Sequence, residues 1–167
     1  MTVKAEAWQS GPVEGVAPLL QPVAHALLNA AEQLHPAVEA LTAEQLVARP
    51  ANVASIDFHV RHAIGSLDRL FTYARGEALS DLQREYLAAE KTSSASTARE
   101  LLQQFDAAVE KAIAQLRATE ESALTDPRKV GRAQLPSTVM GLLFHGAEHT
   151  ARHTGQVVTM SKIVSSD

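Results

Sequence analysis

Apolar residues recur at helical spacing along four long segments of the chain, and this pattern restricts the fold more than any other feature. One segment begins near Pro22, a second spans about 56–75, a third opens at Thr97, and a fourth runs from Thr138 to about Val164. Within each segment the apolar side chains return every three or four residues, which places them on one face of a helix. No stretch shows the alternation of a strand. We therefore predict an all-α four-helix bundle with short extra helical pieces in its connections.

Residues that start or stop helices set the expected boundaries. Ser55 and Thr97 are suited to N-cap positions, where a side-chain oxygen accepts a hydrogen bond from the first turn. Pro36 should bend or end the first helix, because a proline clashes with the carbonyl group four residues earlier. Residues 124–135 interrupt the helical period with a proline and a glycine, and they are predicted to form a loop.

The length of 167 residues fits one domain. Residues 1–15 contain two glycines and a proline and are predicted to form an irregular arm, followed by a single bundle domain over residues 16–167. The net charge of -4, with no cluster of basic residues on a helix, argues against a nucleic-acid partner. Because no run is apolar enough to span a bilayer or resembles a signal peptide, we expect no membrane partner and a cytoplasmic location.

Histidine is the residue type that indicates a functional site in this chain. The chain has no cysteine, so thiolate metal ligands and an internal cysteine nucleophile are excluded. His145, His149 and His153 follow one another at four-residue intervals and lie along one side of the last helix, at the edge of its apolar face. Two such imidazoles are about 5–6 Å apart at Cβ, and a metal ion with bonds of about 2.1 Å can bridge them. The pair formed by His149 and His153 is therefore the best candidate for holding a divalent metal ion.

A stable site needs at least one more ligand, and the second helix offers His59 and His62. On a helical wheel His59 lies nearer the apolar face, while His62 lies further round on the side of Tyr73. The residue geometry slightly favours His59 and leaves the choice open. The histidines of the first helix, His25 and His35, have no partner at a useful spacing and are interpreted as surface or boundary residues.

The sequence also contains parts of two other metal-binding motifs. His145, Glu148 and His149 spell H-x-x-E-H, the inverted zinc-protease motif, in which Glu148 would be the general base. Glu148 falls on the side of the helix away from the apolar face, and the chain is short and helical, so this reading is disfavoured. A di-iron carboxylate bundle needs two E-x-x-H motifs, whereas the chain has one, at residues 32–35.

Two stretches of the sequence resemble a known family. The second helix reads Ser-Ile-Asp-Phe-His-Val-Arg-His-Ala-Ile-Gly-Ser-Leu-Asp-Arg-Leu over residues 55–70. The fourth contains His-Gly-Ala-Glu-His-Thr-Ala-Arg-His-Thr-Gly-Gln over residues 145–156. Together they resemble the DinB-like superfamily of four-helix bundles, which includes thiol-dependent transferases. The resemblance covers nearly the whole chain.

The resemblance implies a divalent metal ion, most often zinc or nickel, held by three histidines. At the matching positions these ligands are His62, His149 and His153, because His62 begins the matching His-Ala-Ile-Gly-Ser stretch; His59 remains the alternative to His62 on helix geometry. The resemblance also implies a transferase that uses a low-molecular-weight thiol, such as bacillithiol or mycothiol, to attack an electrophile. Relatives often form homodimers, which makes a homodimer an expectation for this chain.

Two alternative functions fit the same residues. A metal-assisted hydrolase would use bound water as the nucleophile and Glu148 or His59 as the base. A metal-holding or small-ligand-binding bundle would catalyse no reaction. Gln156, Tyr73, His145 and Glu148 are the candidates for catalytic or ligand-orienting roles at the rim of the site.

Overall fold

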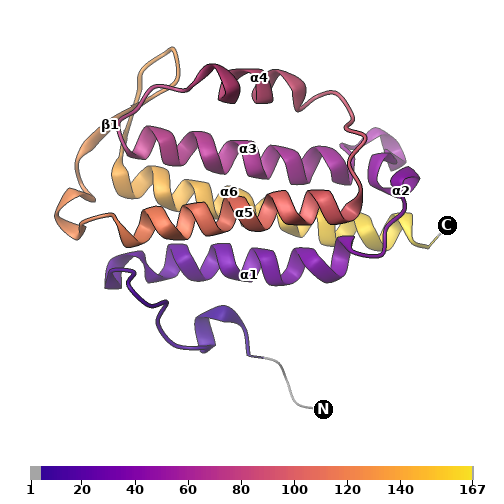
Figure 1. The fold of residues 1–167 in the computed structure, drawn as a ribbon, viewed down its shortest axis with the longest axis horizontal. Helices are drawn as coiled ribbons and strands as arrows, with labels where there is room; N and C mark the ends of the chain where they lie inside the picture. Colours follow the sequence, from indigo (N-terminus) through magenta and orange to yellow (C-terminus); the bar gives the residue numbers. More distant parts are fainter. Residues whose placement is uncertain (1–4, 167) are drawn as a thin grey trace.

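Four long helices lie side by side and enclose the apolar core (Figure 1). The computed structural model describes residues 5–166. Its helices and strands are α1 (Gln21–Val38), α2 (Ala43–Val47), α3 (Ile56–Ala74), α4 (Asp81–Ala89), α5 (Ala98–Arg117), β1 (Pro127–Val130), β2 (Leu135–Thr138) and α6 (Val139–Val164). Single turns of 3-10 helix lie at Ala7–Gln9, Pro18–Leu20, Pro50–Asn52 and Glu121–Ala123. The predicted all-α fold class is therefore confirmed.

The core lies between α1, α3, α5 and α6. Helix α3 packs against α5 and α6, and α1 packs against the same two helices, so the four form a closed ring. The side chains that fill the ring are fully buried aliphatic and aromatic residues, among them Leu27, Leu34, Val60, Leu101, Phe105, Leu116, Leu143 and Val157. Helix α4 lies outside the ring, next to α3 (Figure 1). Among the described residues, no helix combines the length and apolar character needed to cross a membrane.

Side-chain caps begin α3 and α6, the two helices that carry the histidines of the predicted site. Ser55 accepts a hydrogen bond from the backbone N–H of Phe58 at the start of α3, and Thr138 accepts one from Gly141 at the start of α6. Thr97 caps α5 in the same way. The N-cap predictions for Ser55 and Thr97 are confirmed, so the residue at which α3 begins is set by the local sequence.

Two local predictions need correction. Helix α1 ends at Val38, two residues after Pro36, because the missing N–H of a proline in the last turn removes only one hydrogen bond. Part of the predicted loop at 124–135 belongs to a hairpin, in which β1 pairs antiparallel with β2 from Pro127↔Thr138 to Val130↔Leu135. Strands of four residues are too short to show a convincing alternation, which is why the sequence pattern missed them.

Helix α6 approaches α3 closely at Gly146. A Cβ atom at this position would lie 2.9 Å from Cε2 of Phe71 and 3.4 Å from Cδ1 of Leu67, both buried side chains of α3. Because the edge of a packed aromatic ring cannot easily move, the absence of a side chain at Gly146 sets the distance between these two helices.

We expect Gly146→Ala to lower the free energy of unfolding by about 1–3 kcal/mol, because the overpacking outweighs the gain in helix propensity. Gly155→Ala on the same helix is the matched control, since a Cβ there meets no atom within 4 Å. This control should raise the stability by up to about 1 kcal/mol. Urea denaturation of the two metal-free variants measures both effects, and equal stabilities would contradict the argument.

Candidate metal centre

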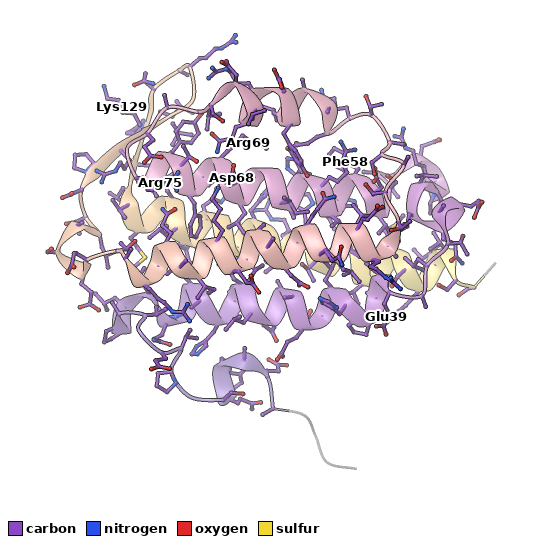
Figure 2. The ribbon with its side chains drawn as sticks, in the orientation of Figure 1. Glu39, Phe58, Asp68, Arg69, Arg75 and Lys129 are labelled. Carbon is purple, nitrogen blue, oxygen red and sulfur yellow. The ribbon has the colours of Figure 1, made fainter. Side chains whose placement is uncertain are left out.

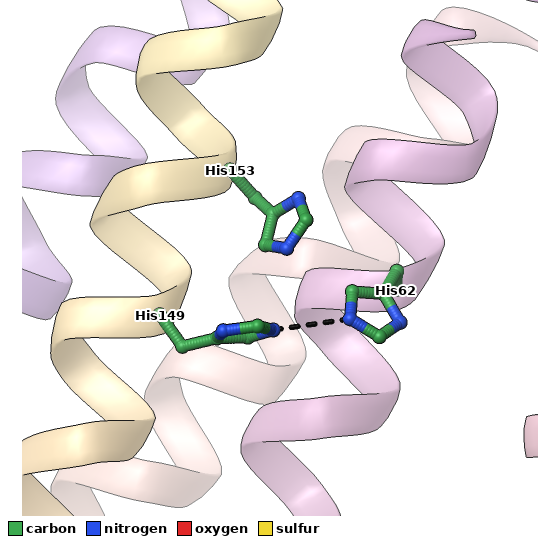
Figure 3. A group of neighbouring side chains, drawn as sticks. All are labelled: His62, His149 and His153. Atoms are coloured by element: carbon green, nitrogen blue, oxygen red, sulfur yellow. Dashed lines mark hydrogen bonds between the residues drawn. The ribbon is translucent and has the colours of Figure 1, made fainter. Parts of the chain in front are cut away.

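Three histidine side chains meet on the flank where α3 packs against α6 (Figure 3). His62 comes from α3, and His149 and His153 come from successive turns of α6. One ring nitrogen from each histidine lies within 4.8 Å of the others. Nε2 of His62 and Nε2 of His149 are 3.0 Å apart. The structure thus brings together the three positions that the family resemblance had selected.

The donor set fits a divalent metal ion. Two imidazole nitrogens bound to one zinc ion with bonds of about 2.0–2.1 Å in tetrahedral geometry lie about 3.3 Å apart, close to the observed contact of 3.0 Å. All three donors are imidazoles, which are ligands suited to zinc, nickel and copper. The group therefore has the chemistry and the spacing of a three-histidine site.

A buried carboxylate orients the first of these rings. Nδ1 of His62 lies 2.8 Å from Oε2 of Glu90, the C-cap residue of α4, so the N–H of His62 is on Nδ1 and Nε2 is free to face the other histidines. The second oxygen of Glu90 accepts a hydrogen bond of 2.6 Å from Arg69. Burial raises the pKa of the Glu90 carboxyl, but the hydrogen bonds from His62 and Arg69 outweigh it and hold the pKa below its usual value.

Glu90 reaches His62 because residue 65 has no side chain. A Cβ atom at Gly65 would lie 2.3 Å from Oε1 of Glu90 and 2.7 Å from the ring of Tyr86. Carboxylate–histidine pairs of this kind commonly fix the tautomer of a metal ligand. The sequence reasoning missed Glu90, because nothing in the local pattern relates it to a histidine 28 residues earlier.

A second histidine orients His153. Nδ1 of His59 lies 2.9 Å from Nδ1 of His153, so one of these nitrogens carries a proton and the other accepts it in a hydrogen bond. This contact leaves Nε2 of His153 to face His62 and His149, as the ring does in Figure 3. His59 is not one of the three grouped histidines; it lies behind His153. His149 differs from His62 and His153, because its Nδ1 is buried without a hydrogen-bond partner among residues 5–166.

The rings of His59, His149 and His153 are neutral at physiological pH. Burial lowers the pKa of His149 to about 4 and that of His153 to about 3, and the neighbouring histidines add to both effects. Burial also lowers the pKa of His59, with a smaller contribution from His62. Because a metal ion binds only the unprotonated ring, these low pKa values keep the lone pairs available far below neutral pH.

The remaining candidate residues lie at the margin of the site. Glu148 is held by Arg152 through hydrogen bonds of 2.6–2.9 Å, which lower the pKa of its carboxyl group. The ring of His145 is 5.5 Å from that of His149, but it is half exposed and outside the group of three. Gln156 is exposed one turn past the site, and Tyr73 packs against the core about three turns of α3 beyond His62.

One further residue beside the site was not predicted. The ring of Phe58 stacks on that of His62, with 5.3 Å between the ring centres and an angle of 6° between their planes. Phe58 lies one turn before His62 on α3, so a search for aromatic residues at that spacing could have found it. Its ring covers one face of the His62 imidazole.

Comparison with known proteins agrees with this architecture. The sequence matches the DinB superfamily over residues 26–157, and the chain therefore belongs to this superfamily of metal-binding helical bundles. In fold it is similar to a conserved protein from Enterococcus faecalis known from a crystal structure. The TM-score is 0.74 at 17% sequence identity, and the similarity covers 90% of this chain and 99% of that one. No curated protein matches the sequence.

The low pKa values make the metal-free protein sensitive to acid. In the unfolded chain His149 and His153 take up protons near pH 6.5, whereas the folded rings stay neutral down to about pH 4 and about pH 3. Their contribution to stability is therefore complete above about pH 6.5 and is lost as the pH falls below it.

Between about pH 7 and about pH 5 we expect the free energy of unfolding to fall by about 1–3 kcal/mol, allowing for solvent screening of half-buried rings. The variant His149→Gln/His153→Gln should show a clearly smaller change, since it lacks both groups. Urea denaturation of metal-free samples at the two pH values makes the comparison, and identical pH dependences would show that the rings are not held neutral.

Proposed function

We propose that the protein holds a divalent metal ion, zinc or nickel, through His62, His149 and His153, and that it uses this ion to activate a low-molecular-weight thiol for transfer to an electrophile. The observation that carries the proposal is the convergence of the three ring nitrogens within 4.8 Å on two packed helices. Their outer partners support it, because Glu90 holds His62 in the tautomer that a ligand needs and His59 holds the Nδ1 edge of His153 away from the other two rings.

Three neutral imidazoles leave both charges of a divalent ion uncompensated and leave coordination positions open, as in catalytic rather than structural zinc sites. When bound in such a site, the ion lowers the pKa of a coordinated thiol or water toward neutrality. The protein's own part is to fix the rings. Glu90 holds the proton on Nδ1 of His62, His59 pairs with Nδ1 of His153, and Phe58 shields one face of His62 from water.

Thiol transfer is favoured over hydrolysis by what surrounds the three histidines. The chain has no cysteine, so a sulfur nucleophile would have to come from solution. A hydrolase would need a free general base, but Glu148 is engaged by Arg152 and has a lowered pKa. The other candidate base, His59, is engaged by His153. Gln156 and His145, at the exposed margin of α6, are the residues we propose for contacts with the incoming molecules.

The metal site can be tested by elemental analysis of protein purified without a histidine tag. We expect the wild type to carry zinc or nickel in stoichiometric amounts, and His149→Ala/His153→Ala to lose it, because a single imidazole cannot hold the ion. His145→Ala is the matched control, since this residue lies on the same face of α6 but outside the group of three, and it should keep its metal. Equal metal content in all three proteins would contradict the site.

The activity can be tested with the metal-loaded protein, an alkylating electrophile such as monobromobimane, and a panel of low-molecular-weight thiols. We expect loss of the electrophile to accelerate only when a thiol is present, and the acceleration to disappear in His149→Ala/His153→Ala. Cleavage of a nitrophenyl ester without any thiol would favour a hydrolase instead. If the protein binds metal but shows neither activity, it is a metal-binding bundle and the transferase proposal fails.

A further inference from the structure

A cavity of about 340 Å³ lies between α3, α4 and α5. None of the three grouped histidines lines it. Figure 2 labels three of its lining residues, Asp68 and Arg69 on α3 and Arg75 directly after the end of that helix. The volume lies at the lower end of the range of about 300–1,000 Å³ that is typical of small-molecule sites.

The cavity has an apolar wall and a polar end. Aliphatic and aromatic side chains from all three helices form the wall, chiefly Ile64, Leu67, Phe71, Leu82, Ala108 and Ala112. Polar groups line the rest, chiefly Asp68, Arg75, Gln83, Lys111 and Gln115. This division suits a molecule with an apolar body and one polar group.

Positive charge predominates among the lining residues. They include Arg69, Arg75 and Lys111 against a single carboxylate, that of Asp68. Arg69 is neutralised by Glu90 behind the wall, and Lys111 lies 2.6 Å from Asp68. The ionic partner of Arg75 is Glu77, a half-exposed carboxylate outside the cavity, and such surface pairs are weak. An anion that enters this end would therefore compete only with Glu77, a solvent-screened carboxylate, for the guanidinium group of Arg75.

Helix α4 forms the outer wall and leaves apolar surface uncovered. None of its residues is buried, and its main contact is with α3. Leu82 of α4 lines the cavity and is nevertheless 76% exposed. An apolar group inside the cavity would cover this surface and add contacts between α4 and the bundle.

We propose that this cavity binds a small amphipathic anion, with an aromatic or aliphatic body against the wall and a carboxylate or sulfonate at the end formed by Arg75 and Lys111. The site is distinct from the metal centre, although the two share a support: Arg69 lines the cavity and donates to Glu90, which orients His62. The proposal does not depend on the thiol chemistry.

Two fluorescent probes that share one apolar body test both parts of the proposal. Anilinonaphthalenesulfonate carries the anionic group, and N-phenylnaphthylamine lacks it. We expect wild-type protein to bind the anionic probe more tightly than the neutral one. Ala108→Phe should abolish or strongly weaken binding of both, because the new ring fills the cavity. Ala114→Phe is the matched control, since Ala114 is an exposed residue of α5 outside the cavity, and it should bind both probes like the wild type.

The variant Lys111→Gln tests whether the charged end of the cavity contributes to binding. Lys111 is exposed, so its replacement leaves the core unchanged. We expect the variant's dissociation constant for the anionic probe to rise about fivefold, with that for the neutral probe unchanged. The helix content of each variant, measured by far-ultraviolet circular dichroism, verifies that it folds. The proposal is overturned if the wild type binds neither probe or binds both equally. It is also overturned if Ala108→Phe folds and binds like Ala114→Phe, or if Lys111→Gln affects both probes alike.

Discussion

The close packing of α3 against α6 is the contact on which the candidate site depends. His62 is on one helix and His149 and His153 on the other, so their nitrogens converge only at the short distance that Gly146 permits against Phe71. The same contact buries the rings enough to lower the pKa of His149 and His153. Core packing and site chemistry therefore have one structural origin, and a change that separates the helices would disturb both.

Glu90 extends this arrangement beyond the helix pair. A buried carboxylate is costly unless its charge is matched and its oxygens are hydrogen-bonded, and here Arg69 and His62 each bind one oxygen. Because Glu90 caps the C-terminus of α4, the ion pair also fixes that helix to α3. The same carboxylate thus sets the tautomer of His62 and, through Arg69, supports the wall of the cavity on the other side.

The sequence alone predicts the part of the site that lies on a single helix. His149 and His153 could be paired from their spacing, since residues one turn apart on a helix share a face whatever surrounds it. The choice between His59 and His62 could not be made in this way. The wheel placed His59 nearer the core, and the structure does bury it, yet the three rings meet on the flank where α6 and α4 reach α3. Glu90 was missed for the same reason, because a tertiary contact between distant segments leaves no local pattern.

The distribution of charge explains why the arrangement suits an anionic ligand. Among the described residues, the only carboxylate hydrogen-bonded to one of the three grouped histidines is Glu90, which binds the outer nitrogen of His62 and is neutralised by Arg69. The inner nitrogens belong to neutral rings, so the protein offers no negative charge where a metal ion would sit. A dication held there keeps its full attraction for a thiolate or hydroxide, whereas a carboxylate in the same position would weaken it. The negative charge therefore lies where it can orient a ligand without compensating an ion, and this position supports our proposal of a reactive metal centre over a purely structural one.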